Sequence, residues 1–169
     1  MKRRDMLLGG AGLLTVLSAG SAAWLMRLGR PAHAAAETDF EIAHTEAEWR
    51  SLLPPDRYGV LREEVTERAF SSPLNDEKRE GMFHCAGCDL AVYSSAKKYD
   101  SGTGWPSFWE AEPDAIGTKE DNTFFMTRTE CHCRRCGGHF GHIFDDGPPP
   151  TGMRHCLNGL ALTFKPATA

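Results

Sequence analysis

Six cysteines carry most of the chemistry that this 169-residue sequence can offer, and they divide unequally. Four of them form two Cys-x-x-Cys pairs, Cys85 with Cys88 and Cys133 with Cys136. Two such pairs in one small domain are typical of a four-thiolate metal site, usually tetrahedral zinc. Iron binds the same kind of site, so the spacing is strong evidence for a bound metal but weaker evidence for zinc over iron. Because four thiolates leave no open coordination position, we expect this site to be structural.

The other two cysteines are not needed for the metal. Cys156 stands in an Arg-His-Cys-Leu-Asn stretch and is free to act as a nucleophile, since the thiolate is the reactive form of the side chain. In a strand, Arg154 would lie on the same side as Cys156 and favour the thiolate, and Asn158 can orient neighbouring groups. Cys131 precedes the second pair by two residues. The plain alternative for a single cysteine is a small buried apolar side chain.

Three further residue types near these cysteines can take part in catalysis. His139 and His142 are natural acid–base and oxygen-binding groups, because imidazole titrates near neutral pH. Asp146 can fix one of these rings. The His-x-x-His spacing also allows a second metal site as an alternative. Trp105 offers a flat, rigid apolar face for a substrate, although a single tryptophan is more often part of a core.

The elements that must position these residues are mainly short strands. Before them, residues 37–70 are polar and helix-prone, with a capping box at residues 45–48 and a second helix opened by Pro54-Pro55 and continuing past Val65. From Gly81 onward, short strands alternate with glycine, proline and aspartate turns. The sequence therefore predicts a mainly antiparallel β domain with an N-terminal helical extension. The expected strands are 81–84, 90–93, 122–127 and 160–164.

The N-terminus has the pattern of an export signal. A short basic segment with the pair Arg3-Arg4 precedes an uncharged apolar run over residues 6–26, and Ala32-His33-Ala34 fits a small-x-small cleavage site. We interpret residues 1–34 as a twin-arginine-type signal peptide, which predicts a periplasmic location for residues 35–169. The alternative is an uncleaved membrane anchor, because the apolar run is long enough to span a bilayer.

Residues 35–169 form one domain by length, and their charge excludes one class of partner. They contain 14 basic and 22 acidic residues, a balance of −8. Nucleic-acid affinity depends on neutralising phosphates, so we expect no nucleic-acid partner. We expect a monomer, with membrane contact only if the signal stays uncleaved. In an oxidising compartment the six cysteines could instead form three disulfides, but the paired spacing favours metal for four of them.

Three stretches, taken with the two Cys-x-x-Cys pairs in this order, resemble a known family. They are residues 101–108, 137–148 and 154–158, whose sequences are Ser-Gly-Thr-Gly-Trp-Pro-Ser-Phe, Gly-Gly-His-Phe-Gly-His-Ile-Phe-Asp-Asp-Gly-Pro and Arg-His-Cys-Leu-Asn. They resemble the B-type methionine sulfoxide reductases, the peptide-methionine (R)-S-oxide reductases, and the resemblance runs from about Trp49 to Phe164. It implies a β fold of two antiparallel sheets with a structural zinc far from the active site.

The resemblance also implies an activity and a set of site residues. The activity is thiol-dependent reduction of methionine-R-sulfoxide in oxidised proteins or peptides, a repair reaction that leaves a sulfenic acid on Cys156 and releases methionine. Such a reaction needs an attacking thiolate, an acid for the departing oxygen and an apolar surface for the methyl–sulfur group. The implied active-site residues are Cys156, His139, His142, Asn158, Arg154, Asp146 and Trp105.

The sequence departs from the family pattern at two positions. Many members carry a cysteine at the position of Thr103, where it resolves the sulfenic acid as an intramolecular disulfide, and a serine at the position of Gly159. Threonine cannot form that disulfide, so two recycling routes remain open. Cys131 can act as the resolving thiol, or an external reductant can attack the sulfenic acid directly. We favour the second route, with a thioredoxin-like periplasmic protein as the reductant.

Three functions of other classes compete with this interpretation. A non-enzymatic binding module on the same four-cysteine scaffold would use an aromatic pocket, but it would not need the thiol, the arginine and the histidine pair together. A rubredoxin-like electron carrier would hold iron in the four-thiolate site. A nucleic-acid-binding zinc ribbon fits worst, given the acidic balance and the export signal.

Overall fold

A computed structural model describes residues 40–123 and 126–168. The expected signal peptide, residues 1–34, lies outside the described residues. Among the helices within the described ranges, none is both long enough and apolar enough to cross a membrane.

Two short helices precede the strands, as the sequence predicts. Helix α1, Glu46–Leu52, is capped by Thr45. The Thr45 hydroxyl accepts a hydrogen bond from the Glu48 amide, and the Glu48 carboxylate accepts one from the Thr45 amide. This is the predicted capping box. Helix α2, Pro55–Glu63, starts with proline at its first position. It is shorter than predicted, because Glu64 adopts a left-handed conformation (φ 57°) that ends the helix.

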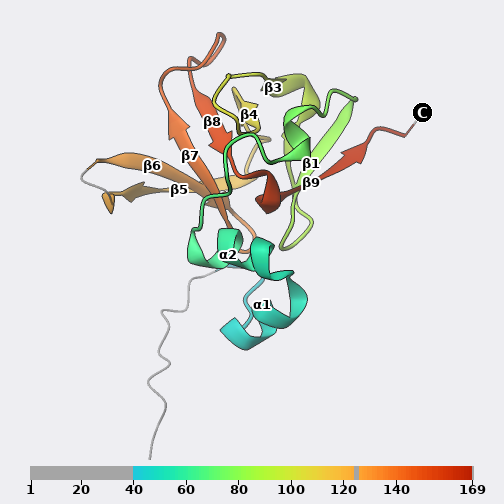
Figure 1. The fold of residues 1–169 in the computed structure, drawn as a ribbon, viewed down its shortest axis with the longest axis vertical. Coiled ribbons are helices and arrows are strands. Elements are labelled where there is room, and N and C mark those ends of the chain that lie inside the picture. Colours follow the sequence, from blue (N-terminus) through green and yellow to red (C-terminus); the bar gives the residue numbers. More distant parts are fainter. Residues whose placement is uncertain (1–39, 124–125, 169) are drawn as a thin grey trace, which may run out of the picture. The chain divides into compact units, whose positions relative to one another are not determined.

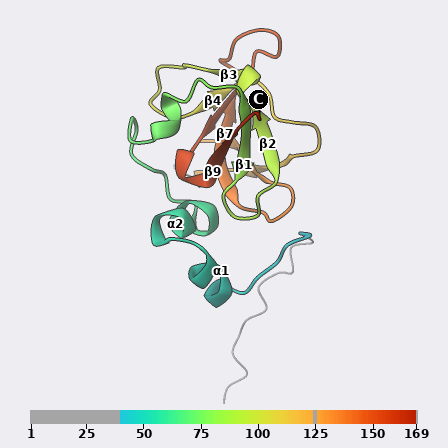
Figure 2. The ribbon, with the colours of Figure 1, turned by 90° about the vertical axis from the view of Figure 1, so that its right-hand side faces the viewer.

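The strands form two antiparallel sheets, which confirms the predicted fold class. The smaller sheet has the order β2-β1-β9 and the larger has the order β3-β4-β8-β7-β6-β5. Figure 2 looks onto the smaller sheet, with β7 and β4 of the larger sheet behind it. The strands are β1 Gly81–Cys85, β2 Ala91–Ser94, β3 Lys98–Tyr99, β4 Ser107–Phe108, β5 Ile116–Asp121, β6 Arg128–Cys133, β7 His139–Phe144, β8 Arg154–Leu157 and β9 Leu162–Pro166.

Three single 3-10 turns lie entirely within the described residues, and the helices cover one end of the strands. The turns are Pro73–Asn75, Ser95–Lys97 and Gly159–Ala161. Helix α2 packs against β7 and against the third of these turns. Figure 1 shows α1 and α2 together at this end, away from the hairpin that joins β7 to β8.

One predicted strand is wrong. The sequence predicts a strand over residues 122–127, but β5 ends at Asp121, β6 begins at Arg128, and the described residues between them belong to neither strand. Residues 124 and 125 lie outside the described residues. The Asp121 carboxylate accepts the Thr123 amide at 2.9 Å, and the Asn122 side chain accepts the Thr127 hydroxyl at 2.8 Å. Side chains that satisfy nearby backbone and hydroxyl groups in this way compete with strand pairing.

Aromatic side chains of both sheets pack together in the part of the core that lies between the sheets. Phe83 of β1 and Phe108 of β4 are both fully buried, and their rings meet edge to face at 4.9 Å. Tyr93 of β2 packs on Phe108 with ring centroids 4.6 Å apart. Aromatic pairs at these distances add to the stabilisation that comes from burying their area. The core therefore uses the inner face of the larger sheet and leaves its outer face for other side chains.

Candidate active site

Cys156 lies in a single row of side chains that crosses the whole larger sheet on its outer face. Directly opposed residues on neighbouring antiparallel strands point to the same face, with Cβ atoms about 5 Å apart. Cys156 is paired with His142 on one side and with Ser107 on the other. From β3 to β5 the row is Tyr99, Ser107, Cys156, His142, Glu130 and Lys119. The register alone thus brings a thiol and an imidazole side by side.

Hydroxyl groups surround the thiol on the β4 side. The Thr103 hydroxyl lies 3.7 Å from the Cys156 sulfur, so Thr103 occupies the place from which a cysteine could reach Cys156. Ser101 contacts both Thr103 and Ser107, with oxygen–oxygen distances of 2.8 and 2.7 Å. The Tyr99 hydroxyl, at the start of the row, is buried and has no hydrogen-bond partner among the described residues.

Arg154 supplies positive charge next to Cys156, as the sequence predicts. Its guanidinium lies over the Phe144 ring at 4.4 Å and donates two hydrogen bonds of 2.8 Å to the Asp146 carboxylate. The Asp146 hydrogen bonds raise the pKa of Arg154, and electrostatic interaction with Cys156 adds to this. The expectation that Asp146 holds a histidine is wrong: it lies beside Arg154 at the β7–β8 hairpin and fixes the arginine instead.

Two other carboxylates hold the histidines. Glu130 of β6 contacts His139 Nδ1 at 2.8 Å, and both side chains are buried. Lys119 lies 2.7 Å from the second Glu130 oxygen and neutralises that carboxylate. Asp121 at the end of β5 accepts His142 Nε2 at 2.8 Å. Each carboxylate thus fixes one ring and leaves its other nitrogen for a different partner.

Burial keeps both imidazoles neutral near pH 7. It lowers the pKa of His139 to about 4, with nearby charges contributing smaller effects. Burial also lowers the pKa of His142, although the hydrogen bond to Asp121 opposes this shift. The two rings meet edge to face with centroids 5.6 Å apart. A neutral imidazole donates through one nitrogen and accepts through the other, so this pair can bind an oxygen and exchange protons with it.

Asn158 and Trp105 are connected through the backbone of Glu67. The Asn158 side chain accepts the Glu67 amide at 2.9 Å and donates to the Phe140 carbonyl at 3.0 Å, so its polar atoms are committed to the backbone. The Glu67 carbonyl in turn accepts the Trp105 indole N–H at 3.1 Å. Asn158 therefore ties β7 to the segment that holds Trp105.

The Glu67 side chain also binds the backbone next to Asn158, and no motif in the sequence indicated this residue. Its carboxylate accepts the amides of Gly159 and Leu160, directly after Asn158. Burial raises the pKa of Glu67, and these two amides lower it again. At Gly159 itself, a Cβ would meet the Ser72 hydroxyl at 1.9 Å. Ser72 therefore fills the space that a side chain at position 159 would need, which explains why glycine stands there in place of the serine of the family pattern.

Trp105 lies beside a second aromatic ring that the sequence did not indicate. Phe70 is 73% exposed and adopts a left-handed backbone conformation (φ 65°). Its amide donates to the Gly104 carbonyl at 2.7 Å. Phe70, Tyr99 and Trp105 line one shallow hollow of about 130 Å³. An exposed aromatic ring held in this conformation gives the site an apolar edge.

Cys131 is not placed where it could react with Cys156. It follows Glu130 in β6, so its side chain points to the opposite face of the sheet from Cys156, and it is fully buried. Strand β7 lies between β6 and β8, which puts the two backbones roughly 10 Å apart, whereas a disulfide needs Cα atoms within about 7 Å. Burial also raises the pKa of Cys131 to about 12.

The remaining four cysteines form one cluster, as the sequence predicts. The sulfurs of Cys85, Cys88, Cys133 and Cys136 all lie within 4.8 Å of one another. Two of the sulfur–sulfur distances are 3.7 and 3.5 Å. A tetrahedral zinc with Zn–S bonds of about 2.3 Å places its sulfurs roughly 3.8 Å apart, so the cluster fits a metal of this size. It joins the turn after β1 to the turn after β6.

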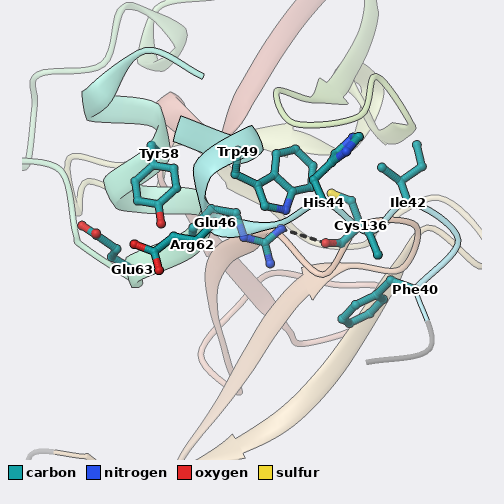
Figure 3. Close-up of a pocket in the computed structure, with 10 residues that line it drawn as sticks. Phe40, Ile42, His44, Glu46, Trp49, Tyr58, Arg62, Glu63 and Cys136 are labelled. Atoms are coloured by element: carbon teal, nitrogen blue, oxygen red, sulfur yellow. Dashed lines mark hydrogen bonds between the residues drawn. The ribbon is translucent and has the colours of Figure 1, made fainter. Parts of the chain in front are cut away.

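A separate hollow lies next to this cluster and away from Cys156. It measures about 430 Å³ and is lined by residues of α1, α2 and the second Cys-x-x-Cys turn, including Trp49, Tyr58 and Cys136. Figure 3 shows Arg62 reaching across it to donate to the Cys136 carbonyl, at 2.8 Å. None of the residues in the row that contains Cys156 lines this hollow, so we do not assign the chemistry to it.

A family model described as the SelR domain matches residues 53–166, which is more than half of the chain. The chain belongs to the SelR family. The matched segment contains both Cys-x-x-Cys pairs and every residue of the row from Tyr99 to Lys119 in the larger sheet. The resemblance drawn from the motifs is therefore confirmed at the level of the family.

Curated relatives extend this SelR assignment over almost their whole length. The "Peptide methionine sulfoxide reductase MsrB" of Thiobacillus denitrificans is 50% identical over 123 residues, which is 72% of this chain and 93% of that protein. The protein of the same name from Agrobacterium fabrum is 45% identical over 130 residues, 76% of this chain and 96% of its own. The protein of the same name from Methanosarcina barkeri is 47% identical over 125 residues, which is 73% of this chain and 88% of that protein.

Proposed function

We propose that this SelR protein reduces methionine-R-sulfoxide in oxidised proteins and peptides to methionine, with Cys156 as the reacting thiol. The observation that carries this proposal is the cross-strand pairing of Cys156 with His142. It sets a thiol beside an imidazole, with Arg154 two residues away on the same face. The three relatives described above, which are 45–50% identical to this chain, are named peptide methionine sulfoxide reductases.

The first half-reaction can be written with the residues in place. The Cys156 thiolate attacks the sulfoxide sulfur, the sulfoxide oxygen passes to the Cys156 sulfur, and methionine leaves. Cys156 loses two electrons and the sulfoxide sulfur gains them, while the thiol proton ends on the sulfenic oxygen. His139 and His142 would bind the oxygen and move this proton, and Arg154 would stabilise the thiolate. Trp105 and Phe70 would hold the methyl–sulfur group.

The second half-reaction returns Cys156 to the thiol. A thiol of an external reductant attacks the sulfenic acid and releases water, and a second thiol of the reductant then displaces Cys156 from the mixed disulfide. We propose this direct route because Cys131 lies behind β7 on the other face of the sheet. If residues 1–34 direct export, the reductant is a periplasmic thioredoxin-like protein.

The four-cysteine cluster would hold a structural metal, for which we propose zinc. Four thiolates supply all four ligands of a closed site, so the metal contributes to folding and leaves the chemistry to Cys156. The cluster connects turns that are 45 residues apart in sequence, from Cys88 to Cys133. Holding these turns together fixes β1 of one sheet against β6 of the other.

Stereospecific turnover tests the proposed activity. The protein, loaded with metal and supplied with dithiothreitol, should reduce the R epimer of an N-acetylated methionine sulfoxide amide. It should leave the S epimer unchanged, because one face of the substrate must meet both Cys156 and the histidines. Methionine is quantified separately for each epimer. Turnover of neither epimer by folded protein would favour a binding module on the same scaffold.

A further inference from the structure

A chain of hydroxyl groups leads from Cys156 to a backbone carbonyl. The Thr103 hydroxyl is 3.7 Å from the Cys156 sulfur and 2.8 Å from the Ser101 hydroxyl. Ser101 lies 2.7 Å from Ser107, which is fully buried and donates to the Trp105 carbonyl at 3.1 Å. The chain therefore has one end at the reacting sulfur and the other at the residue proposed to bind the substrate.

Counting protons sets the direction of every hydrogen bond in this chain, because a hydroxyl donates only once. When Ser107 donates to the Trp105 carbonyl, it must accept from Ser101, and Ser101 must then accept from Thr103. Thr103 has then used its proton and can only accept from the Cys156 thiol. In this direction four protons make four hydrogen bonds, and the sulfur must carry one of the protons.

Loss of the thiol proton leaves Thr103 and the Cys156 sulfur as two acceptors facing each other. If Thr103 alone turned toward the sulfur, its 2.8 Å contact with Ser101 would lose its proton and become repulsive. The contact is restored only if Ser101 turns to donate to Thr103 and Ser107 turns to donate to Ser101. Three protons then make three hydrogen bonds among the hydroxyls and the sulfur with no heavy atom moved, and the Trp105 carbonyl gives up the hydrogen bond that it accepted from Ser107.

We propose that Ser101, Thr103 and Ser107 form a hydroxyl chain that reverses its direction when Cys156 loses its proton, so that Thr103 donates to the thiolate. Thr103 is thus a catalytic residue that contacts the reacting atom, and Ser101 and Ser107 act through it as positioning residues. The inference rests on the proposed function only in taking the Cys156 thiolate as the reacting group. It gives Thr103 a role that needs no disulfide.

Alkylation of Cys156 by iodoacetamide tests this without requiring turnover. The rate is measured against pH in the full-length, metal-loaded protein, by mass analysis of the Cys156 peptide. Thr103→Val keeps the shape and removes the donor, so alkylation at neutral pH should slow roughly ten-fold and its pH profile should move up by about one pH unit. Thr103→Ser keeps the donor and should stay within roughly two-fold of the wild type.

Ser101→Ala separates a chain from a single hydrogen bond, because Ser101 touches Thr103 and not the sulfur. It should slow alkylation by roughly three-fold and shift the profile in the same direction as Thr103→Val. Ser51→Ala, at an exposed serine of α1, is the matched control and should change nothing. If the pH profile of alkylation for Thr103→Val matched that of the wild type, the proposal would be overturned. If the profile for Ser101→Ala matched that of the wild type, the hydroxyl chain beyond Thr103 would be rejected. Turnover of the R epimer is measured separately, so a wrong substrate would not affect this result.

Discussion

Replacing Cys156 by serine should abolish sulfoxide reduction while leaving the fold and the metal intact. A serine hydroxyl cannot accept an oxygen atom as a thiolate does, so we expect a loss of roughly three orders of magnitude or more in turnover. The change alters one atom of a half-buried side chain at the outer face of the sheet, so the melting temperature should stay close to that of the wild type. Turnover of the R epimer with dithiothreitol and thermal unfolding are the two measurements.

Cys131→Ser is the matched control for this substitution. Cys131 is fully buried on the opposite face of the sheet, and direct reduction does not use it. Its replacement should keep turnover with dithiothreitol within roughly two-fold per folded molecule, even if it lowers stability by about 1 kcal/mol. Retained turnover in Cys156→Ser would remove Cys156 from the reaction. Loss of turnover in folded Cys131→Ser would instead support the resolving role for Cys131.

Replacing Cys133 by serine should have the largest effect on stability. Cys133 lies 3.5 Å from Cys88 in the sulfur cluster, and its loss leaves three thiolates for the metal. Because metal binding is part of the folding free energy, we expect bound metal to fall below one atom per chain and stability to drop by at least ~3 kcal/mol. For a domain of this size that corresponds to a melting temperature about 10 °C lower. Elemental analysis and thermal unfolding measure both effects.

The same Cys131→Ser protein serves as the control here, since it changes a cysteine only two residues away in the same strand. It should keep its full metal content, because Cys131 is outside the cluster. Removal of the metal from the wild-type protein with a chelator should reproduce the lower melting temperature of Cys133→Ser. If Cys133→Ser instead kept its metal, its melting temperature and its activity, the cluster would not be a structural metal site.

Local signals in the sequence were sufficient for several elements. The capping box at Thr45 and the proline pair after α1 set both helix starts. The Cys-x-x-Cys spacing identified all four members of the cluster, and the motif around Cys156 identified the thiol. In these cases a short stretch of residues carries the physical reason for the structure, so no distant contact is needed to infer it.

Contacts between distant segments could not be inferred in the same way. Glu130 and Asp121 hold the two histidines only because the β5-β6-β7 register brings them there, and neither belongs to a recognisable motif. Glu67 reaches Gly159 across 92 residues of sequence. The motif that contains His139, His142 and Asp146 does not show that the hairpin places Asp146 on Arg154. The polar strands β5 and β6 lack the alternation that would have predicted them.

One measurement tests the central claim that Cys156 alone takes the oxygen from the substrate. The full-length, metal-loaded protein is mixed with an excess of the R epimer in the absence of any reductant, and the Cys156 peptide is then analysed by mass spectrometry. We predict one methionine released per chain and one oxygen atom added to Cys156, trapped with a reagent specific for sulfenic acids. An unmodified Cys156, or a disulfide between Cys156 and Cys131, would contradict the account.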